Sequence, residues 1–184
     1  AVTPQLIDKE SILIFIDLSK GSRRLGSSIA SQVSSLFGGD VPDVECIKEM
    51  PNFVNTIHGL LKDKKILSYH DRSDGGLITT SIEMAFAGRL GIDIKLDLLP
   101  SNAEDVLADL FNEELGVVIQ VAKEDEELVM KSLDSCSLKQ HSYAFGVLNK
   151  DKDIKLISNN QTIHQWPLKT LLKEWHKVSY EIQS

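Results

Sequence analysis

The strongest pattern along the chain is an uninterrupted apolar run at residues 11–17, which has the length of a β-strand. Such a run is typical of a strand that is buried on both faces. Shorter apolar runs at 66–69 and 117–121 predict two further strands. Residues 92–98 alternate between apolar and polar types, which predicts a strand with one buried face.

The carboxy-terminal third of the chain predicts a hairpin. Strands are expected at 142–147 and 154–157. The pair Asn159-Asn160 then suits a type I′ turn that leads into a strand starting at Thr162.

Apolar residues at helical spacing predict six helices. The first contains Ile29, Val33, Leu36 and Phe37 and ends at the glycine pair 38–39. The others are expected at 53–61, 78–90, 102–112, 124–134 and 168–182. The apolar stripe of the last helix consists of Leu168, Leu171, Leu172, Trp175, Val178 and Ile182.

Strands and helices alternate without a repeat or an internal linker. The pattern predicts a single α+β domain over residues 11–184, built as a mixed β-sheet packed with helices, with residues 1–10 as a connector. The composition of the 184 residues, 42% hydrophobic and 26% charged, suits a domain with a sizeable core.

Several classes of protein are disfavoured. No apolar run approaches the roughly 20 residues that cross a bilayer, and no signal-peptide pattern opens the chain, so we expect neither a membrane nor a secreted protein. The net charge of −7 disfavours nucleic acid as a partner. Cys46 and Cys136 lack the spacing of a zinc site, and two isolated cysteines suit a cytoplasmic protein.

Negative charge is concentrated in residues 101–130, which hold nine acidic residues and one lysine. Two explanations are open. The acids are favourable on the exposed faces and at the amino ends of the two helices predicted there, or they form an acidic docking surface.

The segment with the most chemical content is 70–76, between a short strand and the amino end of a helix. Backbone N–H groups at such a junction attract phosphate. Mg²⁺ usually takes one or two protein carboxylates together with phosphate oxygens and water. Asp71 is placed for such a metal ligand and Ser73 for a nucleotide contact, while Gly75 and Gly76 allow the backbone to approach a ligand closely.

The same residues also have a purely structural explanation. Ser73 or Asp74 can cap the helix, and Asp71 can pair with Arg72 or bond to amides of its own loop.

Other candidate segments carry weaker signals. Residues 21–26 include two glycines and two arginines but lack the spacing of a phosphate-binding loop, so a solvated turn is favoured. Residues 111–116 suit a capped turn better than a metal site. No Gly-x-Ser-x-Gly motif is present, and neither cysteine has a histidine close to it in sequence, which disfavours a serine or cysteine hydrolase.

Taken together, residues 66–76, 85–88, 91–93 and 111–116 resemble the large-type phosphoribosylformylglycinamidine synthase of purine biosynthesis. The likeness begins at residues 3–6 and extends to the closing helix. It concerns one part of that enzyme, the second of its two domains similar to the carboxy-terminal domain of aminoimidazole ribonucleotide synthetase. The family's glutaminase domain has no counterpart in this sequence, which implies an excised domain or a separately encoded piece of a multidomain ligase.

The resemblance implies a reaction and its cofactors. In the family, ATP activates formylglycinamide ribonucleotide, and ammonia from glutamine then gives formylglycinamidine ribonucleotide, ADP and phosphate. By position, Asp71 corresponds to a Mg²⁺ ligand and Ser73 to a contact with ATP or ADP. One of the two nucleotide sites in large-type members is thought to be structural, so no catalytic residue is assigned. Relatives commonly have consecutive glycines where residues 25–28 read Leu-Gly-Ser-Ser, and this loop is therefore not assigned to ligand binding.

The implied partners are the remaining synthase and glutaminase domains of the same enzyme, and the isolated fragment is expected to be inactive. Two other functions stay open. The chain can be a non-catalytic structural and interaction domain that packs against its pseudo-symmetric mate, with an apolar face that drives self-association when uncovered. A free-standing kinase or ligase receives little support, because a two-Mg²⁺ site needs more ligands than one candidate carboxylate.

Overall fold

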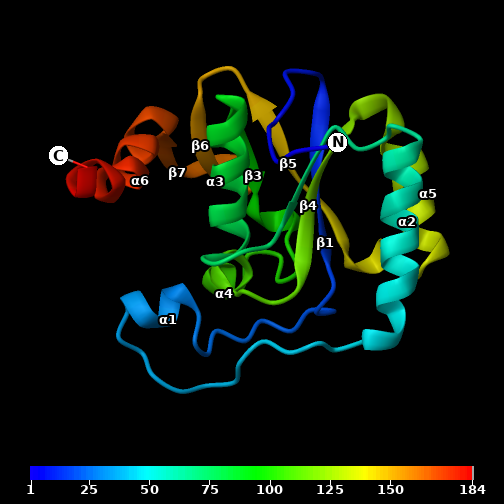
Figure 1. Cartoon of the computed structure of the whole chain (residues 1–184), viewed down its shortest axis with the longest axis horizontal. Helices are drawn as coiled ribbons and strands as arrows, with labels where there is room; N and C mark the ends of the chain where they lie inside the picture. Colours follow the sequence, from blue (N-terminus) through cyan, green and yellow to red (C-terminus); the bar gives the residue numbers. More distant parts are fainter. Residues whose placement is uncertain (184) are drawn as a thin grey trace.

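A computed structural model describes residues 1–183, without the side chains of Val178 and Gln183. A mixed seven-stranded sheet with the order β2-β4-β1-β5-β3-β6-β7 runs through the centre, and helices cover both of its faces (Figure 1). The α+β class expected from the sequence is therefore confirmed. Val178, a member of the apolar stripe predicted for the last helix, lies outside the described side chains.

The interior strand β1 pairs antiparallel with β4 on one side and β5 on the other. Every residue of β1 is buried, as its apolar run predicted. Neighbouring strands are antiparallel throughout the sheet except for the pair β3 and β6. The strands are β1 (Ser11–Asp17), β2 (Ser68–Asp71), β3 (Gly91–Lys95), β4 (Gly116–Ala122), β5 (Ser142–Asn149), β6 (Asp153–Ser158) and β7 (Gln161–Pro167).

Six α-helices accompany the sheet in the described part of the chain. They are α1 (Ile29–Val33), α2 (Met50–Lys62), α3 (Gly76–Gly88), α4 (Val106–Phe111), α5 (Glu126–Ser135) and α6 (Leu168–Gln183). Short 3₁₀ turns lie at Ile47–Glu49, Leu96–Leu98, Lys123–Asp125 and Lys139–His141.

The alternation of side chains along β1 divides the core into two clusters, because successive residues of a strand point to opposite faces. Leu13 and Phe15 pack beneath α3, α4 and α6. Ile14 and Ile16 pack beneath α2 and α5. Figure 1 shows these two groups of helices on opposite sides of the sheet. No described helix is long and apolar enough to cross a membrane.

The hairpin prediction is confirmed. Asn159 and Asn160 join β6 to β7 with φ values of 50° and 59°, and a type I′ turn requires positive φ at both central residues.

Three predicted boundaries are wrong. The strand expected at 66–69 begins two residues later, the strand expected at 92–98 gives way to a 3₁₀ turn, and the helix expected at 102–112 begins only at Val106. Ile66 and Leu96 are fully buried although they lie outside strands, so their apolar character reports burial rather than strand geometry.

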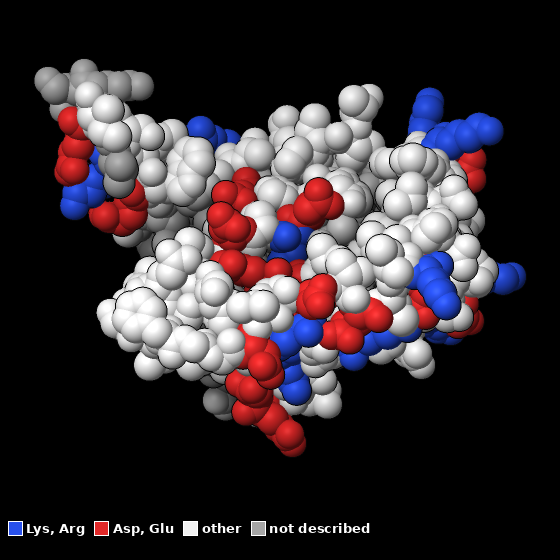
Figure 2. Space-filling model, turned by 60° about the horizontal axis from the view of Figure 1, so that its bottom comes forward, with Lys and Arg blue, Asp and Glu red and all other residues white. Residues whose placement is uncertain are grey.

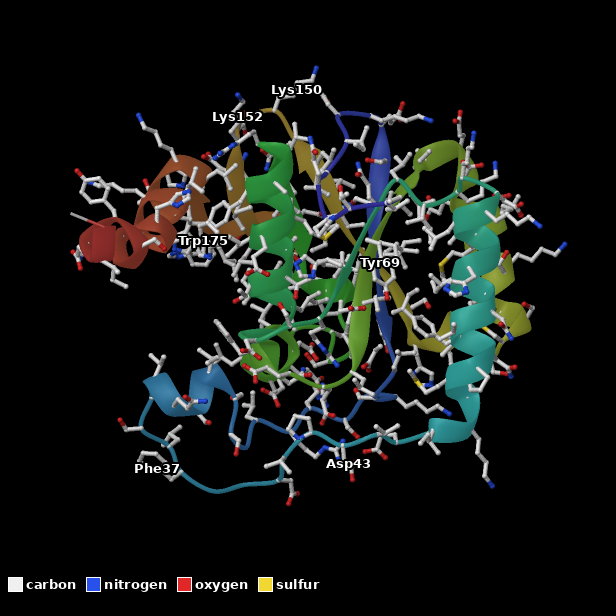
Figure 3. The ribbon with its side chains drawn as sticks, viewed as in Figure 1. Phe37, Asp43, Tyr69, Lys150, Lys152 and Trp175 are labelled. Carbon is white, nitrogen blue, oxygen red and sulfur yellow. The ribbon has the colours of Figure 1, made fainter. Side chains whose placement is uncertain are left out.

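The helix expected over 29–37 is wrong in extent, because α1 ends at Val33. The apolar residues that suggested it do not face the core: Val33 is 82% exposed and Phe37 is 90% exposed. We refer to residues 29–44 as the apolar lobe. Its exposed large apolar side chains are Ile29, Val33, Leu36, Phe37, Val41 and Val44. The lobe lies below the sheet in Figure 1, and Phe37 is labelled on it in Figure 3.

Candidate functional site

The loop that joins β2 to α3 lies at the end of the sheet where β1 also finishes. Asp71 is the last residue of β2, and its side chain is exposed. Figure 2 brings this end of the molecule forward and shows acidic side chains gathered near its centre, beside an uncharged bulge. Asp71 and Ser73, the two residues singled out in the sequence, both belong to this loop.

The Asp71 carboxylate is oriented by a neighbour on the same strand. The Tyr69 hydroxyl donates a hydrogen bond of 2.7 Å to Asp71 Oδ1. Burial of Tyr69, together with the hydrogen bond to the Asp71 carboxylate, raises the pKa of the phenol above its ordinary value. The hydroxyl therefore keeps its proton and acts as a donor at neutral pH.

Arg72 points into the protein, so the structural alternative in which it pairs with Asp71 is wrong. Its Nη2 lies 3.4 Å from Asp17 Oδ1 and 3.0 Å from the Leu115 carbonyl oxygen. The guanidinium carbon lies 4.9 Å from the centre of the Phe15 ring. Burial lowers the pKa of Arg72 to about 10, against the attraction of Asp17, so the side chain stays charged at neutral pH.

Ser73 faces away from Asp71, toward α3. Its hydroxyl lies 3.4 Å from Glu83 Oε2, and its backbone N–H donates to the Thr80 hydroxyl at 3.1 Å. The helix cap is Gly75, with φ of 83° and no side-chain hydrogen bond, so neither Ser73 nor Asp74 caps α3. Ser73 lines a cavity of about 780 Å³ between α3 and α6, and Asp71 is not among the residues of its wall.

The amino end of α3, expected to attract phosphate, is already engaged by the chain itself. Glu113 Oε1 accepts a hydrogen bond of 2.7 Å from the Gly75 N–H and another of 2.8 Å from the N–H of Ile29, the first residue of α1. The Gly76 N–H donates to the Ser73 carbonyl oxygen. One carboxylate thus satisfies donors at the start of two helices.

Gly76 allows another backbone segment to approach closely, and that segment is residues 110–112 rather than a ligand. Its φ is 75°, and a Cβ placed there would lie 2.6 Å from the Leu110 carbonyl oxygen and 2.7 Å from that of Asn112. Only glycine fits a position with this φ and this spacing. The glycine therefore brings the loop before β4 against α3.

Glu114 forms the second attachment of that loop. Its fully buried side chain accepts two hydrogen bonds from Arg24, at 2.6 Å from Nε and 2.8 Å from Nη2. Burial raises the pKa of Glu114, but the hydrogen bonds and charge of Arg24 outweigh it, so the pKa lies below its ordinary value. The same interaction raises the pKa of Arg24.

The acidic residues of 101–130 mostly bind within the chain. Asp105 caps α4 through the Ala108 N–H, and Asp109 accepts a hydrogen bond from the Ser101 N–H at 3.0 Å. Farther along, Glu124 pairs with Lys9 and Asp125 with Lys65. These contacts favour the structural explanation of the negative charge over a docking surface.

The described residues offer a limited set of metal ligands. Among residues 1–183, no group of three or more His, Cys, Asp or Glu side chains is arranged to hold a metal ion. Asp71 is a single exposed carboxylate, already oriented by Tyr69. This donor set fits Mg²⁺, which keeps waters and phosphate oxygens in its coordination shell, and does not fit a cation held by protein ligands alone.

The roles of Arg72, Glu113 and Glu114 could not be predicted from the sequence. Glu113 binds partners 38 and 84 positions away, and Glu114 binds Arg24 at a separation of 90. No local spacing could indicate such contacts. The only indication in the sequence was the pair of acidic residues directly before a predicted buried strand. This pair suggested capping side chains but did not show which backbone groups they bind.

Comparison with known proteins identifies the domain. Residues 13–159 match the family model described as AIR synthase related protein, C-terminal domain. PurLQS from Thermotoga maritima has the same fold, with a TM-score of 0.71 and 13% identity over 92% of this chain. T. maritima PurL complexed with ATP gives a TM-score of 0.71 and 12% identity over 92% of this chain. E. coli HypE, a hydrogenase maturation protein, gives a TM-score of 0.63 and 20% identity over 91% of this chain.

The chain spans 27% of each of the two T. maritima chains and 53% of HypE. At these identities the likeness establishes a shared fold, and one fold serves different functions. The family match covers well over half of the chain and confirms the expected resemblance to the carboxy-terminal domain of aminoimidazole ribonucleotide synthetase. The chain therefore belongs to the family of AIR synthase related proteins, as their C-terminal domain.

Proposed function

We propose that this chain is a domain of an ATP-dependent ligase of de novo purine biosynthesis, phosphoribosylformylglycinamidine synthase, and that it contributes a Mg²⁺–nucleotide site. The observation that carries the proposal is the β2–α3 loop, which presents an exposed, oriented Asp71 carboxylate two positions from Ser73. The fold likeness to T. maritima PurL complexed with ATP supports it.

Each residue of the loop has a distinct role in this proposal. Asp71 would hold Mg²⁺, which supplies charge neutralisation to the phosphates when bound. The Ser73 hydroxyl would contact the nucleotide, ATP or ADP. Tyr69 acts through Asp71 as a positioning residue. The phosphates approach from the Asp71 side, because Glu113 already accepts the N–H of Gly75 at the amino end of α3.

Other domains complete the site. One carboxylate and one hydroxyl are too few to bind a nucleotide tightly, and this chain spans about a quarter of the T. maritima chains of similar fold. The partners are the remaining synthase domain and the glutaminase domain of the same enzyme, in the cytoplasm. Residues of this chain serve either the catalytic or the structural nucleotide site of that enzyme, and none is assigned as catalytic.

A second function is favoured by the apolar lobe. Val33 and Phe37 are almost fully exposed, and an exposed apolar patch of this kind marks a surface that another domain covers. In this alternative the chain is a structural and interaction domain that packs against its pseudo-symmetric mate. Nucleotide binding and domain packing can belong to one domain. They are tested by different variants, Asp71→Asn for the nucleotide site and the double variant Val33→Ser, Phe37→Ser for the apolar lobe.

The test is Asp71→Asn in the full-length protein as it occurs in the cell. We expect the variant to lose Mg²⁺-dependent retention of ATP or ADP through purification while its thermal unfolding midpoint stays unchanged. Asp63→Asn is the matched control, because Asp63 is an exposed carboxylate at the end of α2, outside the β2–α3 loop. Unchanged nucleotide content and unchanged synthase activity in Asp71→Asn would reject the Mg²⁺–nucleotide site and leave the structural function.

A further inference from the structure

The cavity that Ser73 lines has a second wall, formed by α6, which takes no part in the Mg²⁺–nucleotide site proposed above. It lies between α3 and α6 and has a volume of about 780 Å³, within the range of small-molecule sites. Its lining includes Ser73, Asp74, Glu83 and Phe86 on one side and Trp175 and His176 on the other. The wall formed by α6 lies outside residues 13–159, which the family model matches.

The aromatic group of this cavity is Trp175, which lies between α6 and α3 in Figure 3. Its ring packs against Phe86, with 5.7 Å between ring centroids and an angle of 50°. It nevertheless remains 57% exposed, while Phe86 is buried. A large aromatic surface is thus held in place at the cavity wall and left available for stacking on a flat ligand.

The polar groups of the cavity include hydrogen-bond acceptors and donors. Asp74 and Glu83 contribute carboxylates, which accept hydrogen bonds from hydroxyl and amino groups. Glu83 Oε2 also lies 3.2 Å from His70 Nε2. Arg89 and His176 complete the polar part of the wall. An aromatic face next to carboxylates suits a heterocyclic base and a sugar with free hydroxyls.

The position of the cavity relative to Asp71 suits a ligand with an anionic end. Residues two positions apart have Cα atoms within about 7 Å of each other, so the backbone of Asp71 lies close to Ser73 at the cavity wall, while the Asp71 carboxylate lies on the Tyr69 side of β2. In the proposed arrangement the nucleotide extends from Trp175 past Ser73 and around the end of β2 toward a metal ion at Asp71. Its base and sugar then lie in the cavity, and its phosphates lie outside it.

We propose that the α3–α6 cavity binds the nucleoside part of the nucleotide, with Trp175 stacking on the base. The proposal rests on the proposed function and adds to it the position of the base and the residue that recognises it. Phosphate binding through Mg²⁺ at Asp71 and base binding at Trp175 are separate contributions, and they respond to different substitutions.

The experiment measures equilibrium binding of three probes to the full-length protein after removal of bound nucleotide. The probes are Mg²⁺–ADP, adenosine, and Mg²⁺–tripolyphosphate. The main variant is Trp175→Leu, which keeps apolar contact with Phe86 and removes the stacking surface. Trp175→Phe restores a ring, and Tyr180→Phe is the control for a change of aromatic residue on the exposed part of α6. Thermal unfolding of each variant verifies that it is folded.

We expect Trp175→Leu to lower the binding affinity for adenosine and for Mg²⁺–ADP by about 10-fold or more. The affinity for Mg²⁺–tripolyphosphate should stay unchanged. Trp175→Phe should recover most of the affinity, and Tyr180→Phe should match the parent. Asp71→Asn should show the opposite selectivity: it should lose binding of Mg²⁺–tripolyphosphate and keep binding of adenosine.

The possible failures are distinguishable. If Asp71→Asn weakens Mg²⁺–ADP but Trp175→Leu binds ADP and adenosine like the parent, the nucleoside cavity is rejected and the Mg²⁺–nucleotide site stands. A Trp175→Leu variant that loses all three probes equally also rejects selective base stacking. If the parent protein binds neither Mg²⁺–ADP nor adenosine, the proposed function itself is rejected.

Discussion

Glu113 Oε1 lies 2.7 Å from the backbone nitrogen of Gly75 and accepts its hydrogen bond at the amino end of α3. The start of a helix carries a partial positive charge that favours an anion, and here the anion belongs to the protein. The same oxygen accepts the N–H of Ile29 at 2.8 Å, so the carboxylate also anchors the base of the apolar lobe.

Glu113→Ala should therefore lower the free energy of unfolding by about 1–2 kcal/mol, the usual cost of losing a helix cap. Urea unfolding measures the change. Glu104→Ala is the matched control, because Glu104 is an exposed acid of the same segment, and we expect it to stay within about 0.5 kcal/mol of the parent. Equal stability of the two variants would contradict the bridging role of Glu113.

Glu114→Gln should lower the free energy of unfolding by more, about 3 kcal/mol, because it leaves the partly buried Arg24 guanidinium facing a neutral group. The pH dependence follows from the lowered pKa of Glu114. A carboxyl group whose folded pKa lies below its ordinary value of 4.5 contributes stability above that value and loses it as the pH falls through the folded pKa.

Acid unfolding checks this expectation. The parent should lose unfolding free energy more steeply than Glu114→Gln as the pH falls below about 4.5, so that the two curves converge in acid. A constant difference between the two proteins from pH 7 to pH 3 would show that the carboxylate charge of Glu114 is not the stabilising feature.

Tyr69→Phe removes the hydroxyl that orients Asp71 and keeps the ring. Loss of a group that orients a metal ligand typically weakens metal binding by about 10-fold or more. We expect the Mg²⁺ concentration needed for half-maximal nucleotide retention to rise by this factor, with the unfolding midpoint little changed. Tyr180→Phe is the control, since Tyr180 is exposed on α6. An unchanged Mg²⁺ requirement in Tyr69→Phe would remove Tyr69 from the site.

The apolar lobe should drive self-association of the isolated domain. Sedimentation at high concentration should show dimers or larger species, and the double variant Val33→Ser, Phe37→Ser should shift them toward monomer. Ile163→Ser provides the control, because Ile163 is an exposed apolar residue on β7, outside the lobe. A parent domain that stays strictly monomeric would contradict this prediction.

The isolated domain should fold but lack synthase activity. With ATP, Mg²⁺, ammonia and formylglycinamide ribonucleotide, we expect product formation no higher than that of an Asp71→Asn control. The reason is that one carboxylate and one hydroxyl cannot assemble a phosphoryl-transfer site alone. Turnover above the control would show that this chain carries a complete active site.

The parts of the fold that the sequence predicted are those in which one local signal dominates. The apolar run of β1 matches the observed strand at both ends, because that strand is buried on both faces. The Asn159-Asn160 turn was predictable because few residue pairs tolerate two consecutive positive φ values. In the lobe, by contrast, helical spacing of apolar residues was misleading, since Val33 and Phe37 do not face the core.

The candidate site was likewise predictable only in the part that has a local signal in the sequence. Asp71 and Ser73 could be selected from one loop and from a family resemblance, and their ligand roles stay predictions. Their surroundings could not be predicted, because Ser73 shares a cavity with Trp175, which lies on a helix about one hundred residues later in the chain. Contacts at such separations depend on tertiary packing, which local spacing does not encode.

The sheet order has a consequence for how the chain is made. Ser11 pairs with Ala122, and Ile12 pairs with Val147, so β1 has both its partners far downstream. At a synthesis rate of 5–20 residues per second, the ribosome needs roughly 5–20 s to produce β4 after β1. A fully buried strand of the finished sheet is thus the one that stays unpaired for longest on the nascent chain. During that interval its apolar run is a natural substrate for chaperones that shield extended hydrophobic segments.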